Sequence, residues 1–336
     1  RRTTITDGGW EDLTEEDLVS DVPALVSITN RGYIKRVSPK VYRTQARGGR
    51  GVIGQGMKEE DEIDMIIPCR ALHTLLFFSD RGKVYSERVF QIPEGGRTDK
   101  GLSLVNLIAL ETGERITAAV AVPNFETAGY LTFATTQGYM KRVELKEFES
   151  VRTSGLIAIT LQDDDELGWV ALTSGKDEMM LVTANGQALR FKEEDIRPMG
   201  RTARGVIGIR FKEGDRLASM EVVEKDACLL VVTEKGFGKR TKLEEYRCQG
   251  RGTQGVATID KNSLGKIGKI AMARVVQKDD QVTLMSNNGI IIRLQVKDIS
   301  ISGRATRGVT LMNLEKGDKV ASGARFTEDI MHGKTE

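Results

Sequence analysis

The sequence predicts an all-β protein: a closed, propeller-like ring of six four-stranded blades. Three observations lead to this fold class. A short phrase recurs six times, a second glycine-rich phrase follows each copy at a nearly constant distance, and almost every segment between them has the composition of a short strand. The chain has 336 residues with 36 glycines but only 6 prolines, which indicates many tight turns rather than a low-complexity linker.

The first phrase begins at the Thr or Ser that ends a strand. A glycine follows shortly afterwards, and then a second strand that usually carries Lys or Arg. Its glycines are Gly32, Gly82, Gly138, Gly186, Gly236 and Gly289. The glycines of the second phrase are Gly51, Gly101, Gly155, Gly205, Gly255 and Gly308. Within a repeat, the first-phrase and second-phrase glycines are 19 residues apart in five repeats and 17 residues apart in the third. A repeat of about 50 residues is typical of propeller-like rings.

Each repeat contains four runs rich in Val, Ile and Thr, bounded by Gly or Asp, which is the signature of strands. In the first repeat these runs are LVSIT, GYIKRV, GVIGQ and IDMIIPC. The first-phrase glycine fits a short hairpin loop with a positive φ. An open solenoid is the alternative architecture, and it is disfavoured because neither terminal repeat shows a polar capping face.

The repeats also divide the chain into segments. We expect residues 1–23 to form an arm before the ring, 24–326 the ring and 327–336 a loose tail. The expected blades are 24–71, 72–129, 130–177, 178–227, 228–280 and 281–326. Within the arm, Thr14 and Asp17 have a capping-box-like arrangement that predicts a helical turn over 14–19.

The charge is strongly segregated, although the net charge is only +2. The six windows that run from the hairpin to the second glycine together carry +19, so the remaining residues carry −17. On a ring, one cationic position per blade describes a belt around the rim. Copying of the repeat with solvated charges is the alternative explanation, but random solvated faces would mix the signs.

A periodic cationic belt suits a periodic polyanion such as duplex DNA, whose phosphates are neutralised by Lys and Arg with release of counterions. Aromatic residues make up only 5% of the chain, so stacking platforms for single strands are scarce. We therefore predict binding to the duplex backbone with bending and little base readout.

Other chemistry is poorly supported. Gly49, Gly51 and Gly54 match a GxGxxG pattern, but the required strand and helix context is missing. There is no P-loop motif and no nucleophile–base–acid constellation, so we expect no cofactor, no metal site and no catalytic residue in this chain. Three cysteines without a CxxC pair suit a reducing cytoplasm, and no apolar run is long enough to span a membrane.

One segment is unlike the others. Residues 45–51 read QARGGRG, the richest Gly/Arg stretch in the chain. This stretch resembles the "GyrA box" in the A subunit of bacterial DNA gyrase, normally Q[KR]RGG[KR]G. The six repeats, the phrase TNRGYIKR and the opening RRT with its acidic arm also resemble the C-terminal domain of that protein. Ala46 stands where the family usually has a basic residue, which we expect to weaken one contact rather than abolish the box.

The resemblance implies a six-bladed β-pinwheel in which adjacent blades exchange strands and duplex DNA wraps around the basic rim. It implies partners: double-stranded DNA, the N-terminal part of the same gyrase subunit, and gyrase B in an A2B2 holoenzyme that is cytoplasmic and nucleoid-associated. The cleavage tyrosine and ATPase would lie outside this chain. The box residues are Gln45, Arg47, Gly48, Gly49, Arg50 and Gly51. The other expected DNA-binding residues are Lys35, Arg36, Lys141, Arg142, Arg190, Arg201, Arg204, Lys239, Arg240, Arg251, Arg293, Arg304 and Arg307.

Two alternative functions are kept. A C-terminal domain from the related topoisomerase IV is disfavoured by the intact core of the box. A protein-binding propeller of the WD or kelch kind is disfavoured because no Trp-Asp pair occurs and, within the expected ring, GG doublets appear only at 48–49 and 95–96.

Overall fold

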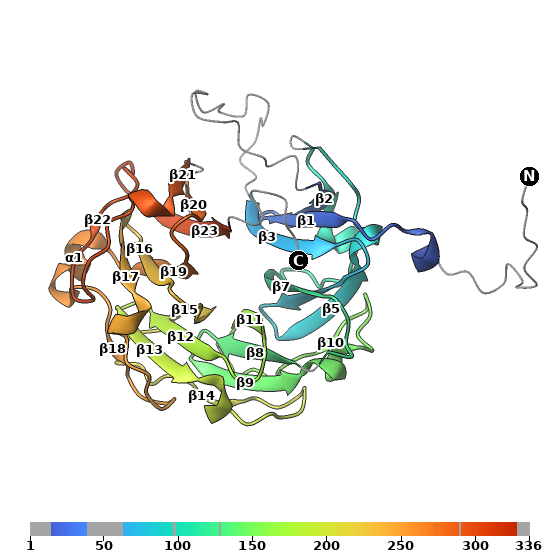
Figure 1. Cartoon of the computed structure of the whole chain (residues 1–336), viewed down its shortest axis with the longest axis horizontal. Coiled ribbons are helices and arrows are strands. Elements are labelled where there is room, and N and C mark those ends of the chain that lie inside the picture. Colours follow the sequence, from blue (N-terminus) through green and yellow to red (C-terminus); the bar gives the residue numbers. More distant parts are fainter. Residues whose placement is uncertain (1–14, 39–62, 97–98, 128, 289, 328–336) are drawn as a thin grey trace, which may run out of the picture.

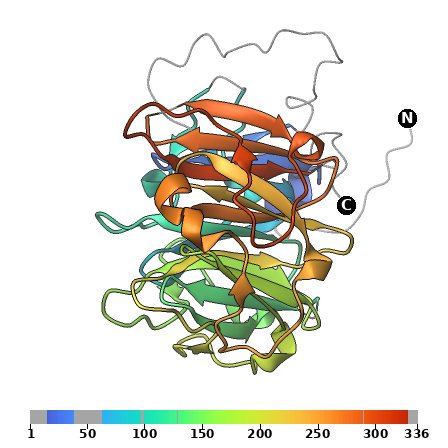
Figure 2. The ribbon, with the colours of Figure 1, turned by 90° about the vertical axis from the view of Figure 1, so that its left-hand side faces the viewer.

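The computed structural model describes residues 15–38, 63–96, 99–127, 129–288 and 290–327. Six small antiparallel sheets stand around a common centre in chain order (Figure 1). Helical structure in the described residues is limited to short 3-10 turns and one four-residue helix, α1 (Leu264–Ile267), on the outer side of the ring (Figures 1 and 2). None of the helices in these residues is long and apolar enough to cross a membrane.

Hydrogen bonds join the strands of each sheet in a recurring order. In the first sheet this order is β3 (Ile63–Arg70), β1 (Pro23–Thr29), β2 (Tyr33–Val37) and β6 (Leu102–Ser103). In the second it is β10 (Leu156–Ile157), β5 (Lys83–Arg88), β4 (Thr74–Ser79) and β7 (Ile116–Val122). In the third it is β11 (Leu167–Thr173), β8 (Tyr130–Thr135), β9 (Tyr139–Glu144) and β14 (Val206–Ile207).

The fourth sheet is β15 (Leu217–Val222), β12 (Glu178–Thr183), β13 (Gln187–Lys192) and β18 (Val256–Ala257). The fifth is β19 (Ile270–Val276), β16 (Cys228–Thr233), β17 (Phe237–Lys242) and β22 (Val309–Thr310). The sixth has three strands within the described residues: β21 (Ile291–Gln295), β20 (Gln281–Ser286) and β23 (Val320–Phe326). The predicted all-β six-bladed pinwheel is therefore confirmed.

In the first five repeats, the hairpin turns at the first-phrase glycine. Gly138 has a φ of 79°, and its N–H donates to the Thr135 carbonyl at 2.9 Å. A Cβ at this position would lie 2.8 Å from the Phe211 ring, so both backbone conformation and space require glycine. The predicted positive φ is confirmed for the first-phrase glycines of the first five repeats, and Gly289 lies outside the described residues.

Adjacent blades exchange strands. The short outermost strand of a sheet comes from the following repeat: β6, which belongs to the second repeat, pairs with β2 through Tyr33–Ser103 and Ile34–Leu102. The same exchange brings β10, β14, β18 and β22 to the preceding sheets. Gly205 makes the crossover before β14 possible, because its φ is 101° and a Cβ there would lie only 2.4 Å from the Met140 carbonyl oxygen. A blade is therefore not one continuous stretch of sequence.

The apolar core lies between neighbouring sheets rather than within one of them. Between the second and third sheets, the ring of Phe78 meets Phe133 edge-on at 5.4 Å, and Phe148 lies 6.2 Å from Phe78. The first and last sheets also meet, because Ile66 of β3 packs against Ala324 and Phe326 of β23. This contact closes the ring and excludes the open solenoid.

The arm contacts the second blade. The helical turn expected over 14–19 is a 3-10 helix, η2 (Glu15–Leu18), and Thr14 lies outside the described residues. Glu16 pairs with Arg88 at 2.8 Å, and Gln91 donates its side-chain amide to Glu15 at 2.9 Å. The arm therefore contacts the ring at the C-terminal end of β5.

Candidate nucleic-acid interface

The expected DNA-binding residues fall into three groups in the structure. The box residues Gln45, Arg47, Gly48, Gly49, Arg50 and Gly51 lie outside the described residues. The second group consists of Lys and Arg on the second strand of each hairpin. The third group lies on the loops that lead into the outermost strands. We call these the rim loops: 150–155, 200–205, 250–255, 303–308 and, in its described part, Gly96 with 99–101.

The strand lysines are buried, not displayed. Lys141 is fully buried, and its ammonium donates to the carbonyls of Ala158 and Arg201 and lies 5.1 Å from the Phe133 ring centroid. Burial lowers its pKa to about 7; the nearby Glu147 carboxylate opposes this shift and Arg201 adds to it. Lys141 was expected to bind DNA, and in this structure its ammonium is covered and turned toward main-chain carbonyls rather than the surface.

Lys239 and Lys35 occupy the equivalent positions. Lys239 is 1% exposed and donates to the Gly303 carbonyl at 2.6 Å, to the Arg304 carbonyl and to the Thr306 hydroxyl at 3.1 Å. Burial lowers its pKa to about 8. Lys35, 7% exposed, donates to the carbonyls of Gly96 at 3.0 Å and Asp99 at 2.6 Å. Burial lowers the pKa of Lys35 also, against the attraction of Asp99.

The strand arginines are likewise used within the fold. Arg240 is 6% exposed and donates to the carbonyls of Ile299 at 2.8 Å and Lys297 at 3.1 Å. Arg142, also 6% exposed, lies 4.4 Å from the Tyr130 ring and donates to the Gly175 carbonyl at 3.1 Å. These two arginines, expected to bind DNA, are thus buried and bonded within the fold.

Arg190 and Arg36 are half-buried and paired. The guanidinium of Arg190 donates to Glu178 at 2.6 Å and to the Leu243 carbonyl at 2.9 Å. Arg36 forms an ion pair with Glu94 at 3.6 Å. Strand cations thus hold the chain of the next repeat against the blade, and we place them behind the interface rather than in it.

The rim-loop cations make fewer hydrogen bonds within the fold than the strand cations. Arg204 is half-buried over the Tyr139 ring at 4.2 Å, and its Nε and one terminal nitrogen of the half-buried Arg201 are covered without a hydrogen-bond partner. Arg307 is exposed, and Arg304 is half-buried, with its backbone N–H donating to Glu245 at 3.2 Å.

Two further predicted cations differ from these. Arg251 donates to the carbonyls of Asp195 at 2.8 Å and Ile207 at 3.0 Å. Arg293 is exposed and lies 4.6 Å from the Phe326 ring centroid.

Sequence reasoning missed two exposed cations on the rim loops. Lys100 lies over the Tyr33 ring at 4.3 Å, in the same arrangement as Arg204 over Tyr139. Arg152 is exposed on the rim loop of the third repeat. The signal was present, because an aromatic residue directly follows the hairpin glycine in the first and third repeats. A long basic side chain covers such a ring while keeping its charge in water.

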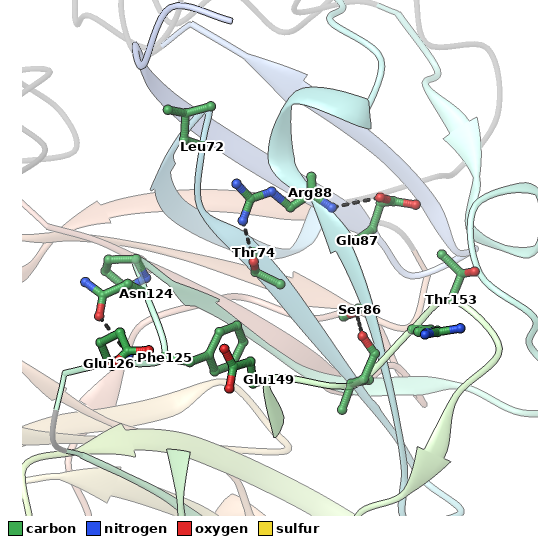
Figure 3. Close-up of a pocket in the computed structure, with 13 residues that line it drawn as sticks. Leu72, Thr74, Ser86, Glu87, Arg88, Asn124, Phe125, Glu126, Glu149 and Thr153 are labelled. Atoms are coloured by element: carbon green, nitrogen blue, oxygen red, sulfur yellow. Dashed lines mark hydrogen bonds between the residues drawn. The ribbon is translucent and has the colours of Figure 1, made fainter. Parts of the chain in front are cut away.

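The described residues also contain a pocket of about 840 Å³ between the second and third blades (Figure 3). Arg88, whose guanidinium donates to Thr74 at 2.9 Å, projects into it together with Glu126 and Glu149. Because acids and bases are mixed in its lining, the pocket does not have the concentrated positive charge of an anion site. Among the described residues, no group of three or more His, Cys, Asp or Glu side chains could hold a metal ion.

Comparison with known proteins identifies the fold's relatives. The family described as DNA gyrase C-terminal domain, beta-propeller, matches residues 24–69, 73–123, 129–174, 177–224, 229–275 and 280–326. The chain belongs to this family of DNA gyrase A C-terminal domains. The six matched segments correspond to the six sequence repeats, and they cover nearly all of the ring.

Individual relatives agree with this assignment. The chain is 50% identical to the DNA gyrase A protein of Halalkalibacterium halodurans over 326 residues, and 51% identical to that of Streptococcus pyogenes serotype M1 over 323. These matches cover 97% and 96% of the chain but 39% of each relative, so the chain spans about two fifths of their length.

Two solved structures share the fold. A C-terminal domain of DNA topoisomerase IV superposes with a TM-score of 0.78 at 30% identity, covering 94% of this chain and 97% of that one. A DNA gyrase A C-terminal domain superposes with a TM-score of 0.75 at 27% identity, covering 91% and 100%. The backbone fold alone does not separate the two enzymes, whereas the more similar curated relatives are gyrase subunits.

Proposed function

We propose that this domain binds duplex DNA on its outer rim without base specificity, bends it, and so gives a gyrase the ability to introduce negative supercoils. The observation that carries the proposal is the charge arrangement: most acids lie outside the rim loops, whereas cations recur on the rim loops around a closed ring, some exposed (Lys100, Arg152 and Arg307) and some half-buried (Arg201, Arg204 and Arg304). Backbone phosphates meet such a surface regardless of sequence.

The rest of the proposed assembly follows from the relatives. We infer that the domain works within a gyrase A protein, beside gyrase B, in the bacterial cytoplasm and on the nucleoid. Those parts would supply cleavage and ATP hydrolysis, and this chain would contribute binding and curvature. A topoisomerase IV role is the second candidate, favoured by the TM-score of 0.78, and the QARGGRG segment favours gyrase.

The interface residues in this proposal are the box together with the rim-loop cations Lys100, Arg152, Arg201, Arg204, Arg304 and Arg307, with Arg293 on β21. The strand lysines Lys35, Lys141 and Lys239 support the rim loops from behind. The strand arginines Arg36, Arg142, Arg190 and Arg240 bond to neighbouring segments outside the rim loops. Arg251 belongs with the supporting residues because its guanidinium is bonded to two carbonyls.

The test measures affinity for a linear duplex of about 150 bp, one persistence length, as a function of salt. Each neutralised phosphate contributes about −0.9 to the slope of log K against log salt. Replacing both Arg304 and Arg307 with Gln should lower the slope magnitude by about two. Lys146→Gln, at an exposed position outside the rim loops, is the control, and it should lower the slope magnitude less per charge removed. A salt-independent affinity, or preference for one short site, overturns the proposal.

A second measurement separates wrapping from simple binding. Relaxed plasmid is incubated with the chain, treated with a nicking-closing enzyme and examined for a shift in linking number. A shift that grows with protein concentration supports wrapping. Binding without any topological shift leaves the charge argument intact and overturns the bending.

A further inference from the structure

The six hairpins differ in an alternating way at one register position. The third residue after the hairpin glycine is Lys in odd-numbered repeats and apolar or aromatic in even-numbered ones. In chain order these residues are Lys35, Tyr85, Lys141, Leu189, Lys239 and Ile292. The repeat that has structural meaning is therefore a pair of blades, and the ring contains three pairs.

Each lysine bonds to the rim loop of the following repeat. Lys239 holds the loop 303–308 through the carbonyls of Gly303 and Arg304 and the hydroxyl of Thr306. Lys141 holds the loop 200–205 through the Arg201 carbonyl. With these carbonyls tied to an ammonium beneath them, the loop backbone is fixed before any ligand arrives.

A carboxylate holds the same loops from a second side. The backbone N–H of Arg201 donates to Glu147 at 3.1 Å, and that of Arg304 donates to Glu245 at 3.2 Å. Glu147 lies in η6 (Leu145–Phe148) and Glu245 in η8 (Leu243–Glu245), each directly after the strand that carries the lysine. The two stations, meaning a lysine with the loop it holds, are thus copies of one arrangement.

The held loops carry paired cations. Loop 200–205 presents Arg201 and Arg204, and loop 303–308 presents Arg304 and Arg307. The buried lysine below adds a further positive charge when it is protonated, and its direct hydrogen-bond partners are neutral main-chain or hydroxyl oxygens. One terminal nitrogen of Arg201 and the Nε of Arg204 are buried without a hydrogen-bond partner, so the fold does not use all the donors of either half-buried side chain. A phosphate is the anion that two neighbouring guanidinium groups fit.

The alternate loops are built differently. In loop 250–255, the guanidinium of Arg251 is turned onto the carbonyls of Asp195 and Ile207. The Leu189 side chain has no donor, and the loop is held instead by the side-chain amide of Gln187, which donates to the Gln254 carbonyl at 3.1 Å. Loop 150–155 is held by the Ser86 hydroxyl, which donates to the Val151 carbonyl at 2.5 Å. That loop has one arginine, Arg152.

We propose that Lys141 and Lys239 are positioning residues of two strong phosphate-binding loops, 200–205 and 303–308, and that Lys35 does the same for Lys100. DNA on the rim is then held most firmly at every second blade, with a threefold rather than a sixfold period. This inference rests on the proposed function, since it ranks contacts within the same interface. Pre-ordering the loop matters because a loop that is already fixed loses less conformational entropy when it binds.

The experiment compares Lys141→Met with Leu189→Met, the matched change at the same register position in a blade without the lysine. Both are measured for salt-dependent affinity to a duplex of about 150 bp. Lys141→Met should lower the slope magnitude by about 1.8 and the affinity about 30-fold near 0.15 M salt, as expected for two lost phosphate contacts. Leu189→Met should leave both unchanged.

A double-mutant cycle distinguishes positioning from general destabilisation. The Arg201→Gln, Arg204→Gln double variant should lose as much as Lys141→Met, and combining all three changes should add nearly nothing, because the lysine acts through the arginines. Additive losses, or an unchanged slope in Lys141→Met, overturn the inference.

A third comparison leaves the buried lysine untouched. Arg201→Gln with Arg204→Gln should reduce the slope far more than Arg251→Gln, and this result decides the question if Lys141→Met does not fold. Equal effects per arginine removed overturn the threefold arrangement. If the wild-type chain itself binds without salt dependence, the proposed function fails, and that outcome is distinct from a failure of the alternation.

Discussion

The buried lysine makes stability depend on pH in a way that can be calculated. Lys141 has a pKa of about 7 in the folded chain against 10.5 for a free lysine, chiefly because its ammonium is desolvated. Between about pH 7 and pH 10.5, Lys141 is more fully protonated in the unfolded chain than in the folded chain. The free energy of unfolding must therefore rise with pH in this range. At about 1.4 kcal/mol per unit of pKa difference, Lys141 contributes an increase of about 2 kcal/mol between pH 7 and pH 9.

Lys141→Met removes this titration. The variant also loses hydrogen bonds to two carbonyls, at a cost of about 1–3 kcal/mol that does not vary with pH. Wild type and variant are compared by urea unfolding with linear extrapolation at about pH 7 and about pH 9, at constant ionic strength. The stability of wild type relative to variant should increase by about 2 kcal/mol at the higher pH. Lys239 and Lys35 titrate in both wild type and variant, so their contributions to the pH dependence cancel in the difference.

Leu189→Met is the control for this comparison, because it changes packing at the equivalent register position without changing charge. Its stability difference from wild type should be the same at both pH values. Parallel pH profiles for wild type and Lys141→Met would refute the reasoning, since they would mean that the ammonium is not desolvated in the folded chain.

Three further predictions concern the crossover glycine Gly205, the buried hydrogen bond between Tyr85 and Glu114, and the box. Gly205→Ala should destabilise the ring by more than about 2 kcal/mol in urea unfolding, because left-handed backbone costs about 1–2 kcal/mol and the new Cβ would meet the Met140 carbonyl at 2.4 Å. Tyr85→Phe removes the hydroxyl that donates to Glu114 at 2.9 Å, and thermal unfolding should show a loss of about 1–3 kcal/mol. Replacing 45–51 with alanines should retain much of the DNA affinity but abolish ATP-driven supercoiling in a reconstituted holoenzyme while relaxation persists; undiminished supercoiling would contradict the assignment of the segment.

The sequence predicted the fold well because the repeat encodes local geometry. A glycine that must adopt a positive φ, followed at 19 residues by another, determines the hairpin and the crossover in most blades. Gly138 and Gly205 both have a positive φ, which is a requirement of the local backbone. Each local signal is weak by itself, but its sixfold repetition predicts a closed ring.

The site was predicted less well because charge counting does not reveal which side chains are covered. Lys141 lies 60 residues before Arg201, whose carbonyl it bonds, and only strand exchange brings the two together. One signal could have been found. The same register position holds Tyr85, Leu189 and Ile292 in other repeats, residues that favour the interior, so a lysine aligned with them is a candidate for burial.

The exchange of outer strands also decides how the molecule comes apart. If each sheet were one continuous repeat, a blade could melt alone and leave its neighbours complete. In this ring the second repeat supplies β6 to the first sheet and receives β10 from the third, so the loss of one repeat exposes an unpaired strand edge on the blade before it. Unfolding should therefore spread from blade to blade as a single cooperative event. Proteolytic cleavage in a segment that leads to an exchanged outer strand should therefore unfold the whole ring, whereas cleavage in a segment that joins two sheets should not.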